Sequence, residues 1–143
     1  MGFNIRKVNL DEAECDKVVT IATDVGHISD ELFENLKGSN LILLESNHDL
    51  EMLKVGPYPY NLKKRIESDT GHLSNERASD IVIALFENGT KKFVLGHLSK
   101  ENNYPELALL TTENKLRENN ICIGKDIYIE VASRSKPGRV ISI

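Results

Sequence analysis

The stretch Val18-Val19-Thr20-Ile21-Ala22-Thr23-Asp24-Val25-Gly26-His27 decides the fold class of this chain. Its first half is short, β-branched and not alternating, which is typical of a strand buried in a parallel sheet. Its second half is polar, and the apolar runs Leu41-Ile42-Leu43-Leu44 and Phe93-Val94-Leu95 are followed by polar clusters in the same way. We therefore expect a mostly parallel group of strands near residues 17–23, 40–45 and 91–96, with the polar clusters on one edge.

Helical patterns separate these strands. Residues 29–38 begin with a candidate N-cap, Ser29, carry acids in the first turn and end at Lys37-Gly38. Apolar residues recur at helical spacing between Ser74 and Asn88 and form a wide stripe that faces a core. The sequence predicts helices and strands over these further segments: helices at 60–68, 74–88 and Pro105 to about Asn119, a half-exposed strand at 127–131, and a last edge strand at 140–143.

The composition is that of an ordinary globular protein. The chain has 143 residues, 22 acidic and 18 basic, for a formal net charge of −4, and this length favours one domain over residues 1–143. No apolar run could span a membrane, and the N-terminus lacks a secretory signal. Cys15 and Cys122 show no pairing pattern, so we expect a protein of the reducing cytoplasm. The acidic balance argues against coating nucleic acid by charge alone.

Histidines and carboxylates gather where the predicted strands end. Ligands bind at the carboxyl ends of strands in open α/β sheets, and oxygen and nitrogen donors together suit a metal-assisted hydrolase. The candidate residues are Asp24 and His27 after the first strand, Glu45, His48 and Asp49 after the second, His97 after the third, and His72 at the start of a helix.

Each of these residues also has a purely structural interpretation. Asp24 could cap the next helix, because acids favour helix starts. His48 and Asp49 could begin a helix with solvated side chains, and His72 could precede a helix cap without a partner. A lone His97 is more often a structural histidine than a ligand. Their convergence on one edge favours the joint functional interpretation.

The basic run Lys63-Lys64-Arg65, near Lys54, has two interpretations. Such a run is most often a solvated helix face, but it could contact a phosphate backbone. The stretch Gly56-Pro57-Tyr58-Pro59-Tyr60 reads most simply as a rigid connection between helices. If it borders the site, its tyrosines could stack on a base.

Five short segments are spread between residues 23 and 103, a range that covers most of the chain. They are residues 23–27, 45–53, 56–60, 71–75 and 96–103. At these segments the sequence resembles the metallo-β-lactamase fold hydrolases, in particular those of the YycJ (WalJ) type. The resemblance implies hydrolysis of phosphodiester bonds with two divalent metal ions, zinc or manganese. For the YycJ type it further implies a nuclease that acts on DNA from 5′ ends.

The resemblance also implies roles for individual residues. Asp24 corresponds to an aspartate that bridges the two metal ions, and His97 to the last histidine ligand. Glu45 and His72 fall where the related ribonuclease Z group carries a glutamate and a histidine used in proton donation. Two sets of residues are supporting candidates: His27, His48 and Asp49 could hold the ligands in place, and Lys63, Lys64 and Arg65 could contact phosphate.

One part of the family pattern is missing. The family's main metal motif, His-x-His-x-Asp-His, does not occur, and no histidine precedes Asp24. The sequence therefore resembles the C-terminal half of such an enzyme: half of an αβ/βα sandwich, with a mixed sheet and helices on one face. Two metal ions each need about four ligands, which Asp24 and His97 cannot supply. We expect the isolated chain to bind metal weakly or not at all and to be inactive.

Three functional hypotheses remain open. The chain could be a piece of a phosphodiesterase that acts on DNA or another nucleic acid only with its missing N-terminal half. It could be a non-catalytic module whose copies self-associate, most simply as a homodimer, to cover a bare sheet face. It could also be a signalling receiver in which Asp24 accepts a phosphoryl group, with Lys100 as a weak candidate for neutralising the phosphate.

Overall fold

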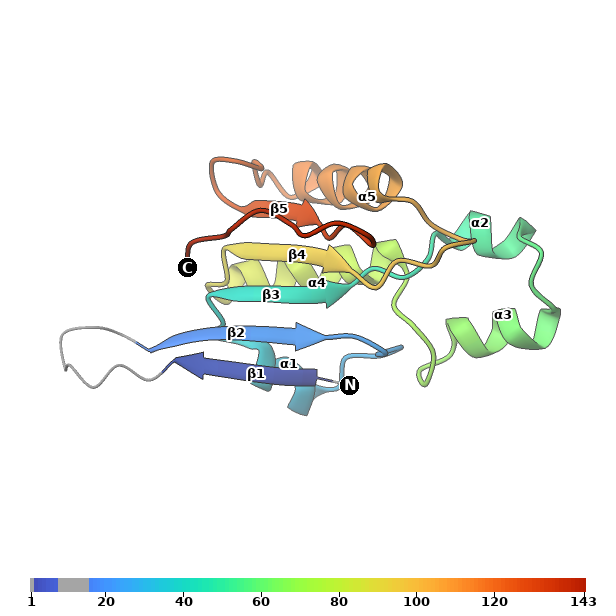
Figure 1. Ribbon diagram of the computed structural model, residues 1–143, viewed down its shortest axis with the longest axis horizontal. Coiled ribbons are helices and arrows are strands. Elements are labelled where there is room, and N and C mark those ends of the chain that lie inside the picture. Colours follow the sequence, from blue (N-terminus) through green and yellow to red (C-terminus); the bar gives the residue numbers. More distant parts are fainter. Residues whose placement is uncertain (1, 8–15) are drawn as a thin grey trace.

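A five-stranded mixed sheet forms the centre of the molecule in a computed structural model that describes residues 2–7 and 16–143 (Figure 1). The strands lie in the order β1-β2-β3-β4-β5. Their bounds are β1 (Gly2–Lys7), β2 (Lys17–Ala22), β3 (Leu41–Glu45), β4 (Lys92–Gly96) and β5 (Tyr128–Val131). The helices are α1 (Asp30–Leu36), α2 (Leu50–Val55), α3 (Tyr60–Glu67), α4 (Asn75–Glu87) and α5 (Pro105–Glu118).

The predicted parallel group is confirmed. The strands β2, β3, β4 and β5 pair in parallel, and the helices expected from capping and periodicity form within a few residues of their predicted ends. Ser29 caps α1 by accepting a hydrogen bond from the Leu32 N–H, and Ser74 caps α4 in the same way. The antiparallel edge strand β1 was not among the expected elements, whereas the short helix α2 begins after Asp49, where a helix start was one interpretation of the sequence.

The prediction of a last edge strand over residues 140–143 is wrong. This segment has no ladder partner in the described part of the chain, and Val140 is 98% exposed. The Ser142 carbonyl accepts a hydrogen bond from the Lys92 ammonium instead of a strand N–H. The chain after β5 runs back past β5 and β4, as Figure 1 shows in dark red. β-Branched residues alone do not make a strand when no sheet edge pairs with them.

The two faces of the sheet differ. One face packs against α1, α4 and α5, and Figure 1 shows α1 and α4 behind the strands. Leu36, Val82 and Leu116, one from each helix, are fully buried there against Ile42, Leu44, Phe93 and Leu95 of the strands. The opposite face of β1, β2 and β3 is apolar as well, and it presents Phe3, Ile5, Val19, Ile21, Leu41 and Leu43. Phe3 and Ile5 are 56% and 60% exposed, so helices cover one face only.

Two loops at the carboxyl edge of the sheet touch through glycines. A Cβ atom on Gly26, in the loop after β2, would lie 2.3 Å from the Ser68 carbonyl oxygen. A Cβ atom on Gly71, in the loop before α4, would lie 2.2 Å from the carbonyl oxygens of Arg65 and Ile66. Only glycine allows backbones to approach this closely. The contact fixes the loop that carries Asp24 against the loop that carries His72.

Buried amides connect the loops that follow β3 and β4. The Asn103 amide donates to the carbonyls of Ser46 and Asn47 and to the side chain of Asn75. Asn75 in turn accepts from the Ser46 hydroxyl. Because these side chains are buried and bonded to one another, they hold the loops in one arrangement.

His48 lies within this packed region with 1% of its surface exposed, so its interpretation as a solvated helix-start residue is wrong. Neither ring nitrogen has a hydrogen-bond partner among the described residues. Burial, followed by the nearby charges of His72 and Arg77, lowers the pKa of His48 to about 4, although Asp49 opposes the shift. Asp49 itself caps α2 by accepting from the Met52 N–H.

None of the helices in the described ranges is both long and apolar enough to cross a membrane. Cys122 is an exposed free thiol, whereas Cys15 lies outside the described residues.

The burial of His48 predicts acid lability. In the unfolded chain this imidazole binds a proton near pH 6.5, and in the folded chain only near pH 4. Its contribution to stability is therefore full above pH 6.5 and is lost as the pH falls toward 4. Between pH 6.5 and 5 the loss amounts to about 2 kcal/mol.

Urea unfolding at several pH values measures this effect. We expect His48→Leu to flatten the fall in free energy of unfolding between pH 6.5 and 5, and His27→Gln, at an exposed position, to leave it unchanged. An unaltered pH dependence in His48→Leu would contradict the assignment.

Candidate metal centre

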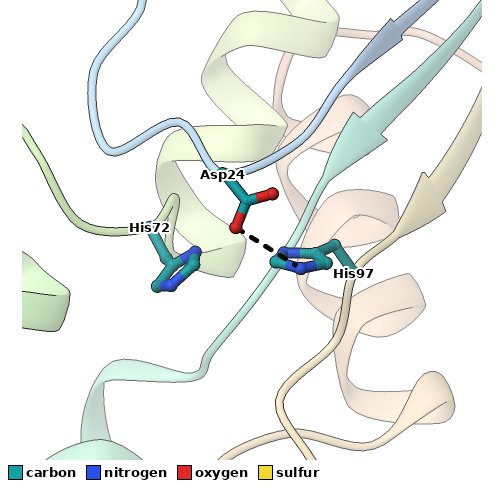
Figure 2. A group of neighbouring side chains, drawn as sticks. All are labelled: Asp24, His72 and His97. Atoms are coloured by element: carbon teal, nitrogen blue, oxygen red, sulfur yellow. Dashed lines mark ion pairs between the residues drawn. The ribbon is translucent and has the colours of Figure 1, made fainter. Parts of the chain in front are cut away.

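Asp24, His72 and His97 meet at the carboxyl edge of the sheet (Figure 2). Asp24 lies two residues after β2, His97 directly follows β4, and His72 lies in the loop that leads into α4. Asp24 and His97 have positive φ angles of 55° and 57°, in the left-handed region that side-chain-bearing residues rarely adopt. The two residues follow β2 and β4, the strands that flank β3 on either side.

One donor atom from each of the three residues lies within 4.8 Å of the other two. His97 Nε2 is 3.7 Å from Asp24 Oδ1, the contact that Figure 2 marks with a dashed line. The two imidazole rings have their centroids 5.4 Å apart and are tilted by 42°. The side chains of His72 and His97 are 30% and 39% exposed, so the group is open to solvent on one side.

Glu45, the last residue of β3, lies behind the two histidines and is fully buried. Its Oε1 atom lies 2.6 Å from His72 Nδ1 and 2.8 Å from His97 Nδ1. Its Oε2 atom accepts from the Val25 N–H at 2.8 Å, directly beside Asp24. One carboxylate thus connects all three segments that carry the group.

These contacts determine the chemistry of both rings. A carboxylate can only accept hydrogen bonds, so the proton of each ring lies on Nδ1 when the imidazole is neutral. Nε2 then carries the lone pair, and this is the arrangement in which a carboxylate behind a histidine prepares it to bind metal.

The donor set fits one divalent ion. Ligand atoms of zinc lie about 2 Å from the ion, so small side-chain movements would let one carboxylate oxygen and two imidazole nitrogens share it. Three protein ligands leave coordination positions for water or substrate. A second ion requires ligands beyond these three residues.

The other residues singled out in the sequence are placed elsewhere. His27 is exposed and is not part of the group of three. Asp49 points its carboxylate at the N-terminus of α2, and His48 has buried, unpartnered ring nitrogens. The interpretation of Asp24 as a helix cap is wrong, because Ser29 caps α1.

A cleft of about 490 Å³ adjoins the group and is lined by Asp24 and His72 on one side and by Tyr58 and Arg65 on the other. Of the basic run, Arg65 alone lines this cleft; Lys63 and Lys64 border a separate depression. The connection between α2 and α3 therefore does border the site, and Tyr58 is its tyrosine that faces the cleft.

Sequence reasoning missed two supports of His97. Its contact with Glu45 spans 52 positions of the chain. Its backbone carbonyl accepts from the Asn47 amide at 2.8 Å, and Asn47 in turn accepts from the Ser99 N–H. The signal in the sequence was the pair of amide-rich clusters after β3 and β4, but only the fold shows that they meet.

No protein-family model matches this sequence. Among curated proteins, two strains of Streptococcus pneumoniae, D39 and R6, have an "Exodeoxyribonuclease WalJ" that is 44% identical over 114 residues. This match covers 80% of the present chain and 42% of the relative. "Exodeoxyribonuclease YycJ" of Bacillus anthracis is 36% identical over 125 residues, which cover 87% of this chain and 47% of the relative.

The match confirms the resemblance seen in the sequence, but only for one part of each relative. The matched residues span less than half the length of these proteins. Over four fifths of its own length, the chain is a homologue of one part of the WalJ/YycJ exodeoxyribonucleases.

Proposed function

We propose that this chain supplies part of the catalytic centre of a metal-dependent nuclease that hydrolyses phosphodiester bonds in DNA. The observation that supports it most strongly is the buried Glu45 carboxylate bonded to two imidazoles beside Asp24. The homologues are named exodeoxyribonucleases, which favours a hydrolase of this class. In this proposal the chain corresponds to one half of a metallo-β-lactamase fold, and it is inactive without the remainder.

Of the three donors, Asp24 and His97 would hold the metal, zinc or manganese, and His72 would stay off the ion, with its Nε2 left to carry a proton. A bound divalent cation would supply Lewis-acid chemistry, which activates water and neutralises charge on phosphate. Asp24, the more exposed of the two side chains, would also hold a second ion, whose further ligands would come from a partner polypeptide. With so few ligands of its own, the isolated chain would bind metal only weakly.

His72 would supply the proton that the reaction needs. When water adds to phosphorus it releases one proton to solvent, the bond to the departing oxygen breaks, and that oxygen must gain a proton. His72 lies at the cleft wall with Nδ1 held by Glu45, so Nε2 is the atom that can deliver the proton. The neutral ring then regains a proton from solvent. Histidine is suited to this exchange because it titrates near neutral pH.

A second candidate function is self-association without catalysis. The apolar face formed by Phe3, Ile5, Val19, Ile21, Leu41 and Leu43 favours it, because exposed apolar surface of this kind marks an interaction site. In this second function the face would be covered by a second copy of this chain, whereas in the nuclease it would be covered by the polypeptide that completes the enzyme. A receiver function is less compatible with the site, because imidazoles rather than further carboxylates face Asp24.

Single substitutions separate the proposed roles. We expect Asp24→Ala and His97→Ala to abolish binding of manganese or zinc, measured by calorimetry after the chain is combined with the remaining segment of a relative. We expect His72→Ala to leave this binding in place and to lower DNA hydrolysis by roughly 10²–10⁴-fold. Hydrolysis is measured after the chain is combined with the remaining segment of a relative.

A substrate with a good leaving group provides the control. A nitrophenyl phosphodiester scarcely needs protonation of its leaving oxygen, so the His72→Ala chain should cleave it nearly as well as the unmodified one. Equal impairment on both substrates, or loss of metal binding in His72→Ala, would show that His72 is not the acid.

The apolar face predicts association of the isolated chain. Sedimentation velocity at high micromolar concentration should show a homodimer, because pairing two such faces removes apolar surface from water. We expect Ile5→Lys to yield monomers and Leu110→Lys, at a 51% exposed position on α5, to leave the dimer intact. A monomeric unmodified chain would count against the use of this face.

A further inference from the structure

The cleft beside Asp24 and His72 has two walls of different character. One wall consists of Asp24 and His72 of the candidate metal centre with Asn47 and Ser99. The other is formed by the connection between α2 and α3, by one side of α3 and by the loop after this helix, and it contributes Tyr58, Arg65 and Thr70. The cleft volume, about 490 Å³, falls in the range of pockets that enclose a single small ligand. A cleft of this size can hold one nucleotide unit.

Arg65 supplies positive charge to this cleft. It lies near the C-terminal end of α3, and its guanidinium forms no hydrogen bond or ion pair with any residue of the described ranges. Leu62, Arg65 and Ile66 share one side of the helix, as spacings of three and four residues require, and all three line the cleft. An arginine without an anionic partner beside carboxylate and imidazole ligands is suited to bind a phosphate in two-pronged geometry.

The two neighbouring lysines, Lys63 and Lys64, contact groups outside this cleft. Lys63 donates to the Lys54 carbonyl at 2.7 Å. The Lys64 ammonium lies 4.9 Å from the centre of the Tyr60 ring. Both lysines border a depression between α2 and α3 that does not include Arg65. The three basic side chains therefore extend from α3 to different places, and of the three only Arg65 lines the cleft beside the metal centre.

Tyr58 adds a rigid aromatic surface to the same wall. It is half-buried and lies between Pro57 and Pro59, whose rings restrict the backbone on both sides. A side chain held in this way loses little freedom when a ligand packs on it. Nucleobases stack on such surfaces without regard to sequence.

We infer that this cleft is a subsite for a terminal nucleotide of single-stranded DNA, in which Arg65 binds a terminal phosphate and Tyr58 packs against the base. The inference rests on the proposed nuclease function and adds to it a means of recognising strand ends. A terminal phosphate carries more negative charge than an internal one and is free on more sides, so the guanidinium favours it. The phosphate could lie at the 5′ or the 3′ terminus, because both present the same group.

Binding of short oligonucleotides to the chain tests this inference without any cleavage. The probes are three single-stranded DNA decamers with an internal fluorophore: one with a 5′-phosphate, one with a 3′-phosphate and one with hydroxyls at both ends. Fluorescence anisotropy is recorded in EDTA, so that no metal-dependent hydrolysis takes place. We expect one of the two phosphates to strengthen binding by about tenfold, the order of one charge-assisted contact.

Matched variants assign this gain to the cleft. Arg65→Gln should remove the preference for a phosphorylated end, whereas Lys64→Gln, with the same change of charge on the same helix, should keep it. Tyr58→Ala should weaken binding of all three decamers by about fivefold or more, Tyr58→Phe should retain it, and Tyr60→Ala should have a smaller effect. Far-ultraviolet circular dichroism confirms that the variants are folded.

Several results would overturn the subsite. Equal binding of the three decamers, equal losses in Arg65→Gln and Lys64→Gln, or no binding by the unmodified chain would each exclude it. These outcomes leave the metal and hydrolysis measurements on Asp24, His72 and His97 unaffected. Conversely, a phosphate preference that depends on Arg65, without any metal-dependent hydrolysis after the chain is completed, would retain the subsite and refute the nuclease.

Discussion

The buried carboxylate of Glu45 is the interaction on which the rest of the site depends. It lies at the end of a central strand with none of its surface exposed, and it bonds to Val25, His72 and His97. A buried charge is very costly unless several donors surround it. The three segments that supply these donors are therefore held where the carboxylate needs them. The same bonds that stabilise the charge orient both imidazoles toward Asp24.

The backbone conformation at two residues of the site is unfavourable in free energy, and contacts around the site offset this cost. Left-handed conformations at Asp24 and His97 each cost about 1–3 kcal/mol. The hydrogen bond from the Asn47 amide to the His97 carbonyl and the close packing of Gly26 on the neighbouring loop hold these strand ends in place. The open apolar face on the other side of the sheet is separate from this arrangement. The group of Asp24, His72 and His97 can thus form within this chain, and the apolar face of the sheet stays available to a partner.

Local patterns in the sequence predict much of the fold and only part of the site. Short β-branched runs and serine caps predict the parallel strands and most helices, because both signals act within a few residues. Strand β1 depends on antiparallel pairing with β2, although the alternation of Phe3 and Ile5 was a signal for it. The contact of Glu45 with His97, the burial of His48 and the separation of Arg65 from Lys64 arise from packing between distant segments. No spacing in the sequence encodes such contacts.

The protonation pattern of the two imidazoles is the most direct test of the role of Glu45. Long-range ¹H–¹⁵N NMR spectra of the chain, recorded without metal and with both rings neutral, distinguish the two ring nitrogens. If Glu45 orients both rings, His72 and His97 carry their proton on Nδ1 and leave Nε2 unprotonated. Glu45→Gln should reduce this preference in at least one ring and leave exposed His27 unchanged. Spectra of the unmodified chain in which both rings carry their proton on Nε2 would contradict this role of Glu45.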